Sequence, residues 1–274
     1  IFYLILNKSG LKYYLYSMYI SYLISFAVAF VLSYQLIDSF KKPVFHDFIK
    51  MFKYGVVAQL ASIFQLLNYR LAYYLIDIFI GRASLGVFSA ATQICEGLWI
   101  FGKSIATVLF VNISNSTNLE QSRALSKRLL KFTLTVTFLP LLVLMFLPSS
   151  FYINFLGDSF GNVPFVIRWL SVGTLSLSGS AILSTYFSGS GKIRINTYGS
   201  GLGMIVTLVA GFVFVPFFGM NGAALVNTLS YFTSLLFLIY HFKKEGEISI
   251  NDFILTKSDV IEVLGMLTSK IKKG

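Results

Sequence analysis

Residues 54–114 decide the fold, because they hold two long apolar stretches in succession: YGVVAQLASIFQLLNYRLAYYLIDIFI (54–80) and LGVFSAATQICEGLWIFGKSIATVLFVNIS (85–114). Only the four residues GRAS separate them. A charge in the middle of a membrane span is costly unless it meets a partner or a wet cavity. We therefore expect function from some of the four ionisable residues inside these stretches, which are Arg70, Asp77, Glu96 and Lys103.

The composition is that of an integral, all-α membrane protein. Hydrophobic residues make up 56% of the 274 residues and charged residues only 12%, whereas soluble domains have about 25% charged residues. Several apolar runs exceed the roughly 20 residues that cross a bilayer as a helix. These runs lack the polar faces at helical spacing that core helices of a soluble protein would need.

The hydropathy pattern predicts a polytopic protein with seven complete transmembrane helices. Pro148 and Pro216 are expected to end the fourth and sixth spans, and residues 219–221 to form a tight turn between the last two. Residues 119–130 have apolar side chains at helical spacing, which favours a helix lying along the membrane surface. The predicted spans are 11–37, 54–80, 85–111, 132–147, 164–187, 197–215 and 222–240.

Three parts follow from this pattern. Residues 1–50 are interpreted as the end of an N-terminal bundle, namely its last span and a polar connector at 38–53. Residues 51–244 form a C-terminal six-helix transmembrane bundle, and residues 245–274 form a basic cytoplasmic tail with a capping box at Thr256 and Asp259. Because residues 1–6 are apolar but too short to span, we expect the chain to be the C-terminal part of a longer protein.

The basic residues indicate the orientation. With seven spans, the loops on the side of the C-terminus hold twelve Lys and Arg residues, and the loops on the other side hold three. The positive-inside rule therefore predicts a multi-pass protein of the cytoplasmic (inner) membrane with its C-terminus in the cytoplasm. The same rule accounts for the net charge of +11 without a nucleic-acid partner.

Motifs for metals, cofactors and catalysis are not found. Cys95 is the single cysteine and is expected to be a packing residue, and His46 and His241 lie far apart, so neither a metal nor a cofactor is expected. The segment GSGK at 189–192 is not a phosphate loop, because Tyr186 stands where its first glycine is required. The predicted outer loops lack the acidic and histidine residues of an enzyme site, so no enzyme is expected. Gly199 and Gly203 have the spacing that lets membrane helices approach closely.

The charged hairpin has a simple predicted geometry. Arg70 and Glu96 lie at similar distances from the Arg82 turn, within about 3 Å of the same depth. Asp77 follows Arg70 by nearly two helical turns, and Lys103 follows Glu96 in the same way. Two interpretations are open: Arg70 and Glu96 form a buried pair that fixes helix register, or the charges line a polar cavity and face an anionic substrate.

Several short stretches, in their order and spacing, resemble the polysaccharide-biosynthesis exporters, the Wzx-type O-antigen and lipid-linked oligosaccharide flippases of the MOP superfamily, which are related to the MATE transporters. Two positions depart from the family pattern: Ala72, where many members have an acidic residue, and Val111, where many have proline. The matching stretches are NYR (68–70), Gly81, LGVFSAA (85–91), EGLW (96–99), VLF (108–110), IS (113–114), LGDSF (156–160), GSG (189–191) and VPFFGMNGAA (215–224).

The resemblance implies a MATE-like transporter of two bundles that rocks around a central cationic cavity. The implied substrate is a sugar chain on undecaprenyl pyrophosphate, flipped across the cytoplasmic membrane for surface polysaccharide synthesis such as that of lipopolysaccharide. Arginine suits a pyrophosphate because it donates several charge-assisted hydrogen bonds. The implied partners are membrane lipids, a coupling ion (H⁺ or Na⁺), and polysaccharide polymerase and glycosyltransferase proteins. The implied cavity residues are Arg70, Glu96, Lys103 and Asp77.

Two alternatives belong to other functional classes. A MATE-like small-molecule antiporter shares the fold, although the tyrosines, Arg70 and the Gly-Ala-Ala turn at 222–224 fit it less well. A membrane polysaccharide polymerase or acyltransferase would need reactive residues in its outer loops, where residues 149–163 offer only Asp158.

Overall fold

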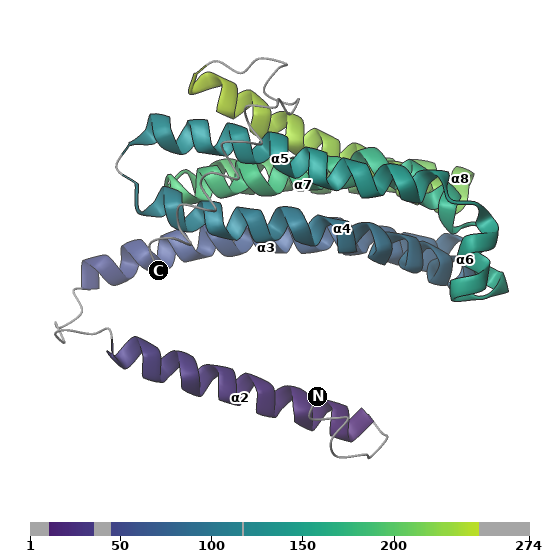
Figure 1. Cartoon of the computed structure of the whole chain (residues 1–274), viewed down its shortest axis with the longest axis horizontal. Coiled ribbons are helices and arrows are strands. Elements are labelled where there is room, and N and C mark those ends of the chain that lie inside the picture. Colours follow the sequence, from purple (N-terminus) through teal and green to yellow (C-terminus); the bar gives the residue numbers. More distant parts are fainter. Residues whose placement is uncertain (1–10, 36–44, 117, 247–274) are drawn as a thin grey trace. The chain divides into compact units, whose positions relative to one another are not determined.

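The computed structural model describes residues 11–35, 45–116 and 118–246, and these contain helices and no strand. The chain divides into two compact units, Ile1–Met51 and Phe52–Gly274. In the first unit, α2 (Leu11–Gln35) is a single helix of 25 residues (Figure 1). The predicted capping box at Thr256 and Asp259 lies outside the described residues.

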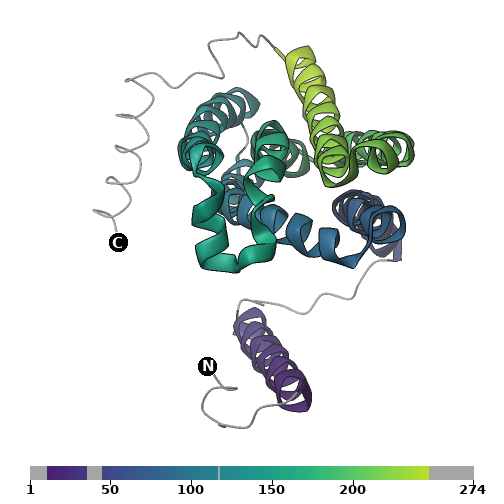
Figure 2. The same cartoon turned by 90° about the vertical axis from the view of Figure 1, so that its right-hand side faces the viewer.

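The second unit is a bundle of long helices that lie side by side (Figure 1). Helix α7 packs against α4, α5 and α8 (Figure 2). It has the most continuously buried surface of the bundle. Short helices follow α5 at one end of the bundle. The boundary between the units falls within α3 (Phe45–Phe79). The elements that follow α3 are α4 (Arg82–Ser114), α5 (Leu119–Phe146), α6 (Ser149–Leu156), η1 (Asp158–Phe160), α7 (Val163–Gly189) and α8 (Ile193–Lys244).

Five helices in the described part of the chain are long and apolar enough to cross a membrane. They are α2, α4, α5, α7 and α8; α3 is not among them, and α8 counts once although its backbone breaks inside it. The all-α, multi-helix prediction is confirmed, whereas the count of seven spans is not. The division of the chain into residues 1–50, 51–244 and 245–274 stays a prediction.

Helix α8 folds back on itself, so that its two arms pack against each other. Gly219 has the non-helical angles φ 58° and ψ −135°, which only glycine adopts readily. Ser230 and Ser234 of the second arm lie within hydrogen-bond distance of the Gly203 and Gly199 carbonyl oxygens, at 2.8 and 3.0 Å. The turn at 219–221 and the close approach at the two glycines were correctly predicted.

Three predicted boundaries are wrong for a common reason, which is that charge or proline ends a hydropathy run without ending a helix. Helix α3 begins at Phe45, inside the predicted connector, because lysine is a good helix former. Residues 119–130 are the first turns of α5 rather than a separate surface helix. Pro216 lies inside α8 and does not end it, since neighbouring groups in a helix bundle can satisfy the backbone that proline frees.

The start of α5 is fixed locally. The Asn118 side chain accepts hydrogen bonds from the backbone N–H groups of Glu120 and Gln121, at 3.0 and 3.2 Å. This N-cap stabilises the helix by about 1 kcal/mol. The negative charge of Glu120 in the first turn also stabilises the helix, because it lies near the positive end of the helix dipole.

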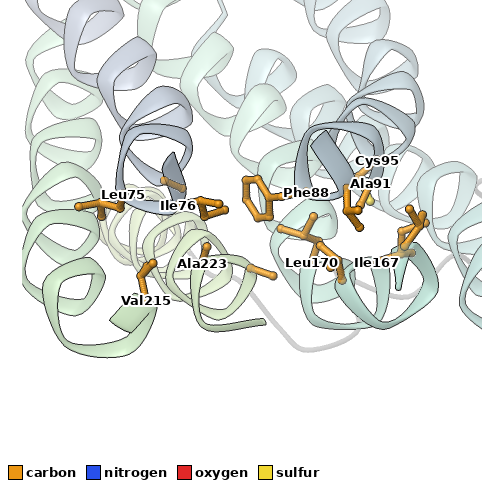
Figure 3. Packing of buried hydrophobic residues seen from close by; sticks show 14 of the residues in the cluster. Leu75, Ile76, Phe88, Ala91, Cys95, Ile167, Leu170, Val215 and Ala223 are labelled. Carbon is orange, nitrogen blue, oxygen red and sulfur yellow. The ribbon is translucent and has the colours of Figure 1, made fainter. Parts of the chain in front are cut away.

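The apolar core contains residues of α3, α4, α5, α6, α7 and α8, and Figure 3 shows part of it. Cys95 belongs to this core, as predicted, and is 4% exposed. A second core cluster lies toward the other ends of α4, α5, α7 and α8, around Tyr186 and Phe242. Residues labelled in Figure 3 are Leu75 and Ile76 of α3, Phe88, Ala91 and Cys95 of α4, Ile167 and Leu170 of α7, and Val215 and Ala223 of α8.

Candidate functional site

Arg70 is an exposed residue of α3. Its guanidinium carbon lies 5.4 Å from the centroid of the Tyr73 ring. A cation at this distance is attracted to the negative face of an aromatic ring, by about 0.5–1 kcal/mol at an exposed site. Tyr73 therefore holds the guanidinium near the helix and leaves its N–H groups accessible to a ligand.

Glu96 is half-buried on α4, and the charges of both Arg70 and Lys103 act on its carboxylate. Arg70 and Lys103 are thus within electrostatic reach of Glu96, while the shared role of the three residues in a site stays a prediction. Among residues 45–116, however, no ion pair within 4 Å joins Arg70 to Glu96, so the two form a loose electrostatic cluster rather than a tight pair. Two positive charges and one negative charge leave the cluster with a net positive charge.

Lys103 is exposed one turn beyond Trp99 on the same face of α4. The Lys103 ammonium lies 4.7 Å from the centroid of the Trp99 ring. Trp99 contacts the edge of Tyr69 at a centroid distance of 5.7 Å, and Tyr69 contacts Tyr231 at 5.6 Å. These three rings connect α4, α3 and α8 in one aromatic row that begins at the Lys103 charge.

A cavity of about 420 Å³ opens beside this row. It lies between α3, α4 and α7, and Lys103 is the charged side chain on its wall. Aromatic rings beside a single cation suit a ligand that combines a negative charge with flat or ring-shaped groups. The wall is formed by Gln65, Tyr69, Trp99, Lys103, Ala106, Thr107, Phe110, Ala181, Ser184, Thr185 and Ser188.

Asp77 lies apart from the other predicted site residues, near the end of α3. Its carboxylate is 3.9 Å from the Arg82 guanidinium, and the two side chains are 45% and 94% exposed. An ion pair this exposed contributes about 0–1 kcal/mol to stability. Asp77 is therefore placed as a surface residue next to the turn between α3 and α4.

Asn68 is a buried polar residue whose role was not predicted from the sequence. It is 4% exposed, and its carbonyl oxygen accepts hydrogen bonds from the hydroxyl groups of Thr207 and Ser230, the latter at 2.7 Å. The cluster ties α3 to both arms of α8. Asn68 stands in the NYR stretch, but its partners are 139 and 162 residues away, and no periodicity within one helix points to them.

These features define a class of protein: a polytopic helical membrane protein with a cationic, aromatic-lined cavity between its helices, as transporters have. The chain belongs to the lipid II flippase MurJ family, whose model matches residues 16–271. The predicted relationship to the lipid flippases of the MOP superfamily is thereby confirmed, whereas the predicted Wzx-type specificity is not.

Individual relatives are distant. The chain is 22% identical over 237 residues to the capsular polysaccharide biosynthesis protein CapF of Staphylococcus aureus, which covers 81% of this chain and 60% of the relative. The fold of this chain is similar to that of a lipid II flippase MurJ in an inward closed conformation. The TM-score is 0.59 and the sequence identity is 19%, with coverage of 75% of this chain and 43% of that chain. An outward-facing multidrug resistance MATE transporter gives a TM-score of 0.54 and 17% identity, covering 76% of this chain and 49% of that one.

Proposed function

We propose that the protein containing this chain flips an undecaprenyl-pyrophosphate-linked oligosaccharide across the cytoplasmic membrane for surface polysaccharide synthesis. Family membership and the similarity to a capsular polysaccharide protein support a lipid-linked precursor as substrate. The observation that carries the proposal is the cavity beside Lys103, which joins one cation to a row of aromatic rings. The chain spans 60% or less of the relatives it matches, so this is a proposal about the whole protein.

The site residues have distinct roles in this proposal. Lys103 and Arg70 attract the pyrophosphate, because both cations are exposed and each is held over an aromatic ring. Glu96 lies within electrostatic reach of both cations, so it weakens their hold on the anion and permits release after translocation. We assign no catalytic residue, since flipping moves the lipid without changing its bonds.

The bundle is proposed to move by alternating access in the cytoplasmic membrane, with the C-terminus in the cytoplasm. H⁺ or Na⁺ is the proposed coupling ion, and polysaccharide polymerase and glycosyltransferase proteins are the proposed partners. The glycan that is transported, an O-antigen unit or another oligosaccharide, is proposed to depend on cavity residues, which differ among proteins of the same fold.

The experiment uses the gene that encodes the full-length protein. Its deletion should cause lipid-linked oligosaccharide to accumulate on the cytoplasmic face, and the wild-type gene should restore export. Arg70→Ala should reach the membrane at normal levels without restoring export. Arg194→Ala is the matched control, because Arg194 is also exposed but lies on α8 outside the charge cluster. Deletion without accumulation would contradict the proposal.

A MATE-like antiporter is the second candidate, favoured by the structural similarity to the multidrug transporter. It predicts that the deletion strain accumulates cationic drugs, while its surface polysaccharide stays normal. Measuring both quantities in the same strain separates the two functions.

A further inference from the structure

A second cavity of about 230 Å³ lies between α3, α7 and α8, and no charged residue lines it. Its wall is rich in neutral polar side chains, including Ser62 and Gln65 of α3, Ser180 and Ser184 of α7, and Asn196 and Ser200 of α8. Some of these groups have partners in their own helix, since the Ser62 and Ser184 hydroxyls donate to the carbonyl oxygens of Ala58 and Ala181. A polar group on this wall without such a partner is costly inside a membrane bundle unless something in the cavity forms a hydrogen bond with it.

Three polar groups on this wall have no hydrogen-bond partner among the described residues. They are the Tyr69 hydroxyl, the Ser180 hydroxyl and the Asn196 side-chain carbonyl oxygen. The Asn196 amide nitrogen donates to the Ser184 carbonyl oxygen and to the Ser188 hydroxyl, both at 2.8 Å. These two bonds fix the direction of the amide, so the free carbonyl oxygen is a preorganised acceptor. Buried polar groups of folded proteins almost always have partners.

The neutral cavity adjoins the cavity beside Lys103. Both are lined by Gln65, Tyr69, Ser184 and Ser188. Tyr69 and Tyr231 also line the neutral cavity, and they belong to the aromatic row that ends at Trp99 and Lys103. A ligand in the neutral cavity is therefore next to the cavity whose wall carries the positive charge of Lys103.

The chemistry of the neutral cavity selects among ligands. A bare cation would prefer carboxylate oxygens, a phosphate would prefer cations, and an apolar drug would leave the serines unpaired. A sugar ring offers several hydroxyl groups that both donate and accept, and it has apolar faces that pack on aromatic rings. The volume corresponds to about eight water molecules at roughly 30 Å³ each, which fits one monosaccharide rather than an oligosaccharide.

We infer that the neutral cavity binds the sugar attached directly to the pyrophosphate, while Lys103 binds the pyrophosphate itself. This inference rests on the proposed flippase function and adds a sugar subsite within the described bundle. The Ser180 hydroxyl and the Asn196 carbonyl oxygen are the groups that contact the sugar, and Tyr69 packs against its ring. The subsite makes recognition depend on the first sugar and not on the lipid carrier alone.

The test compares two probes on the purified full-length protein in nanodiscs: undecaprenyl pyrophosphate, and undecaprenyl pyrophosphate that carries one monosaccharide. Ser180→Ala removes a hydroxyl group that forms no bond within the described protein. We expect this variant to bind the sugar-bearing probe about tenfold more weakly, a change of about 1.4 kcal/mol, and the sugar-free probe as the wild type does. Ser176→Ala is the matched control on the same helix, because the Ser176 hydroxyl donates to the Val172 carbonyl oxygen outside the cavity. It should bind both probes normally.

Lys103→Gln separates this inference from the proposed function. It should weaken the binding of both probes by a similar factor, because both carry the pyrophosphate. If Lys103→Gln weakens both probes and Ser180→Ala weakens neither, the cavity holds only water and the sugar subsite is wrong, while the flippase proposal stands. A wild-type protein that binds neither probe would overturn both.

Discussion

The guanidinium of Arg123, near the start of α5, donates a hydrogen bond of 2.6 Å to the carbonyl oxygen of Phe242, near the end of α8, and lies 4.8 Å from the centroid of its ring. It also donates to the carbonyl oxygen of Gly246. Nearby, the Lys192 ammonium lies 2.7 Å from the Glu245 carboxylate. Together these contacts connect the start of α5 with the two ends of α8, on the side predicted to be cytoplasmic.

Arg123→Ala should therefore destabilise the bundle. The variant loses the charge-assisted hydrogen bonds from the guanidinium to the carbonyl oxygens of Phe242 and Gly246, and we expect a loss of about 2–3 kcal/mol. The reaction of buried Cys95 with a fluorescent thiol reagent during heating reports unfolding, because the core must open to expose it. Arg194→Ala should change stability by less than about 0.5 kcal/mol, and an equal loss in both variants would argue against the role of Arg123.

The glycine spacing in α8 leads to a second prediction. A Cβ atom on Gly203 would lie 2.3 Å from the Ser234 hydroxyl oxygen and 2.8 Å from the Asn68 amide nitrogen. Gly203→Ala should push the two arms of α8 apart and lower stability by about 1–3 kcal/mol. Gly86→Ala is the control in a helix, because nothing lies within 4 Å of its added Cβ; it should be neutral or stabilising. Thermal unfolding of both variants in the same detergent measures the difference.

The long apolar runs allowed most helices to be predicted from the sequence, because a membrane span must be both apolar and helical along its length. The helix ends were harder to predict. Lysines in residues 45–53 and 119–131 end an apolar run, but they do not end the helix, because lysine has a high helix propensity. The break in α8 is at Gly219, whose backbone angles other residues rarely adopt. Pro216 only removes one backbone N–H donor from the helix.

The candidate site was predictable only in part. Charges within apolar runs are conspicuous in a sequence, and the helical rise brought Arg70 and Glu96 to a similar depth. The sequence did not reveal the Asn68 cluster or the serine-lined cavity, because serine and asparagine are common in membrane helices and their partners lie on other helices. Which serines face one cavity depends on the rotation of α3, α7 and α8 about their axes.

Glu96 provides a prediction about substrate release. Its carboxylate offsets the positive charge of Arg70 and Lys103, so Glu96→Gln should bind undecaprenyl pyrophosphate more tightly and export more slowly. A unit charge about 10 Å from the ligand contributes roughly 1–2 kcal/mol at an effective dielectric constant of about 20, or about tenfold in affinity. Binding to the purified full-length protein and export in cells measure the two effects. Unchanged affinity with lost export would instead indicate that Glu96 carries the coupling proton.

Asp77 and Lys103 were predicted as members of the same site, and their placement distinguishes them. Asp77 forms an exposed ion pair with Arg82, which contributes little to stability, while Lys103 lines the cavity beside Trp99. In the deletion strain, Asp77→Asn should therefore restore export to nearly the wild-type level, whereas Lys103→Gln should restore about a tenth of it or less, as expected from the loss of one charge-assisted hydrogen bond. Equal loss of export in the two variants, at equal membrane levels, would return Asp77 to the substrate path and imply that the outer end of α3 moves toward the cavity during transport.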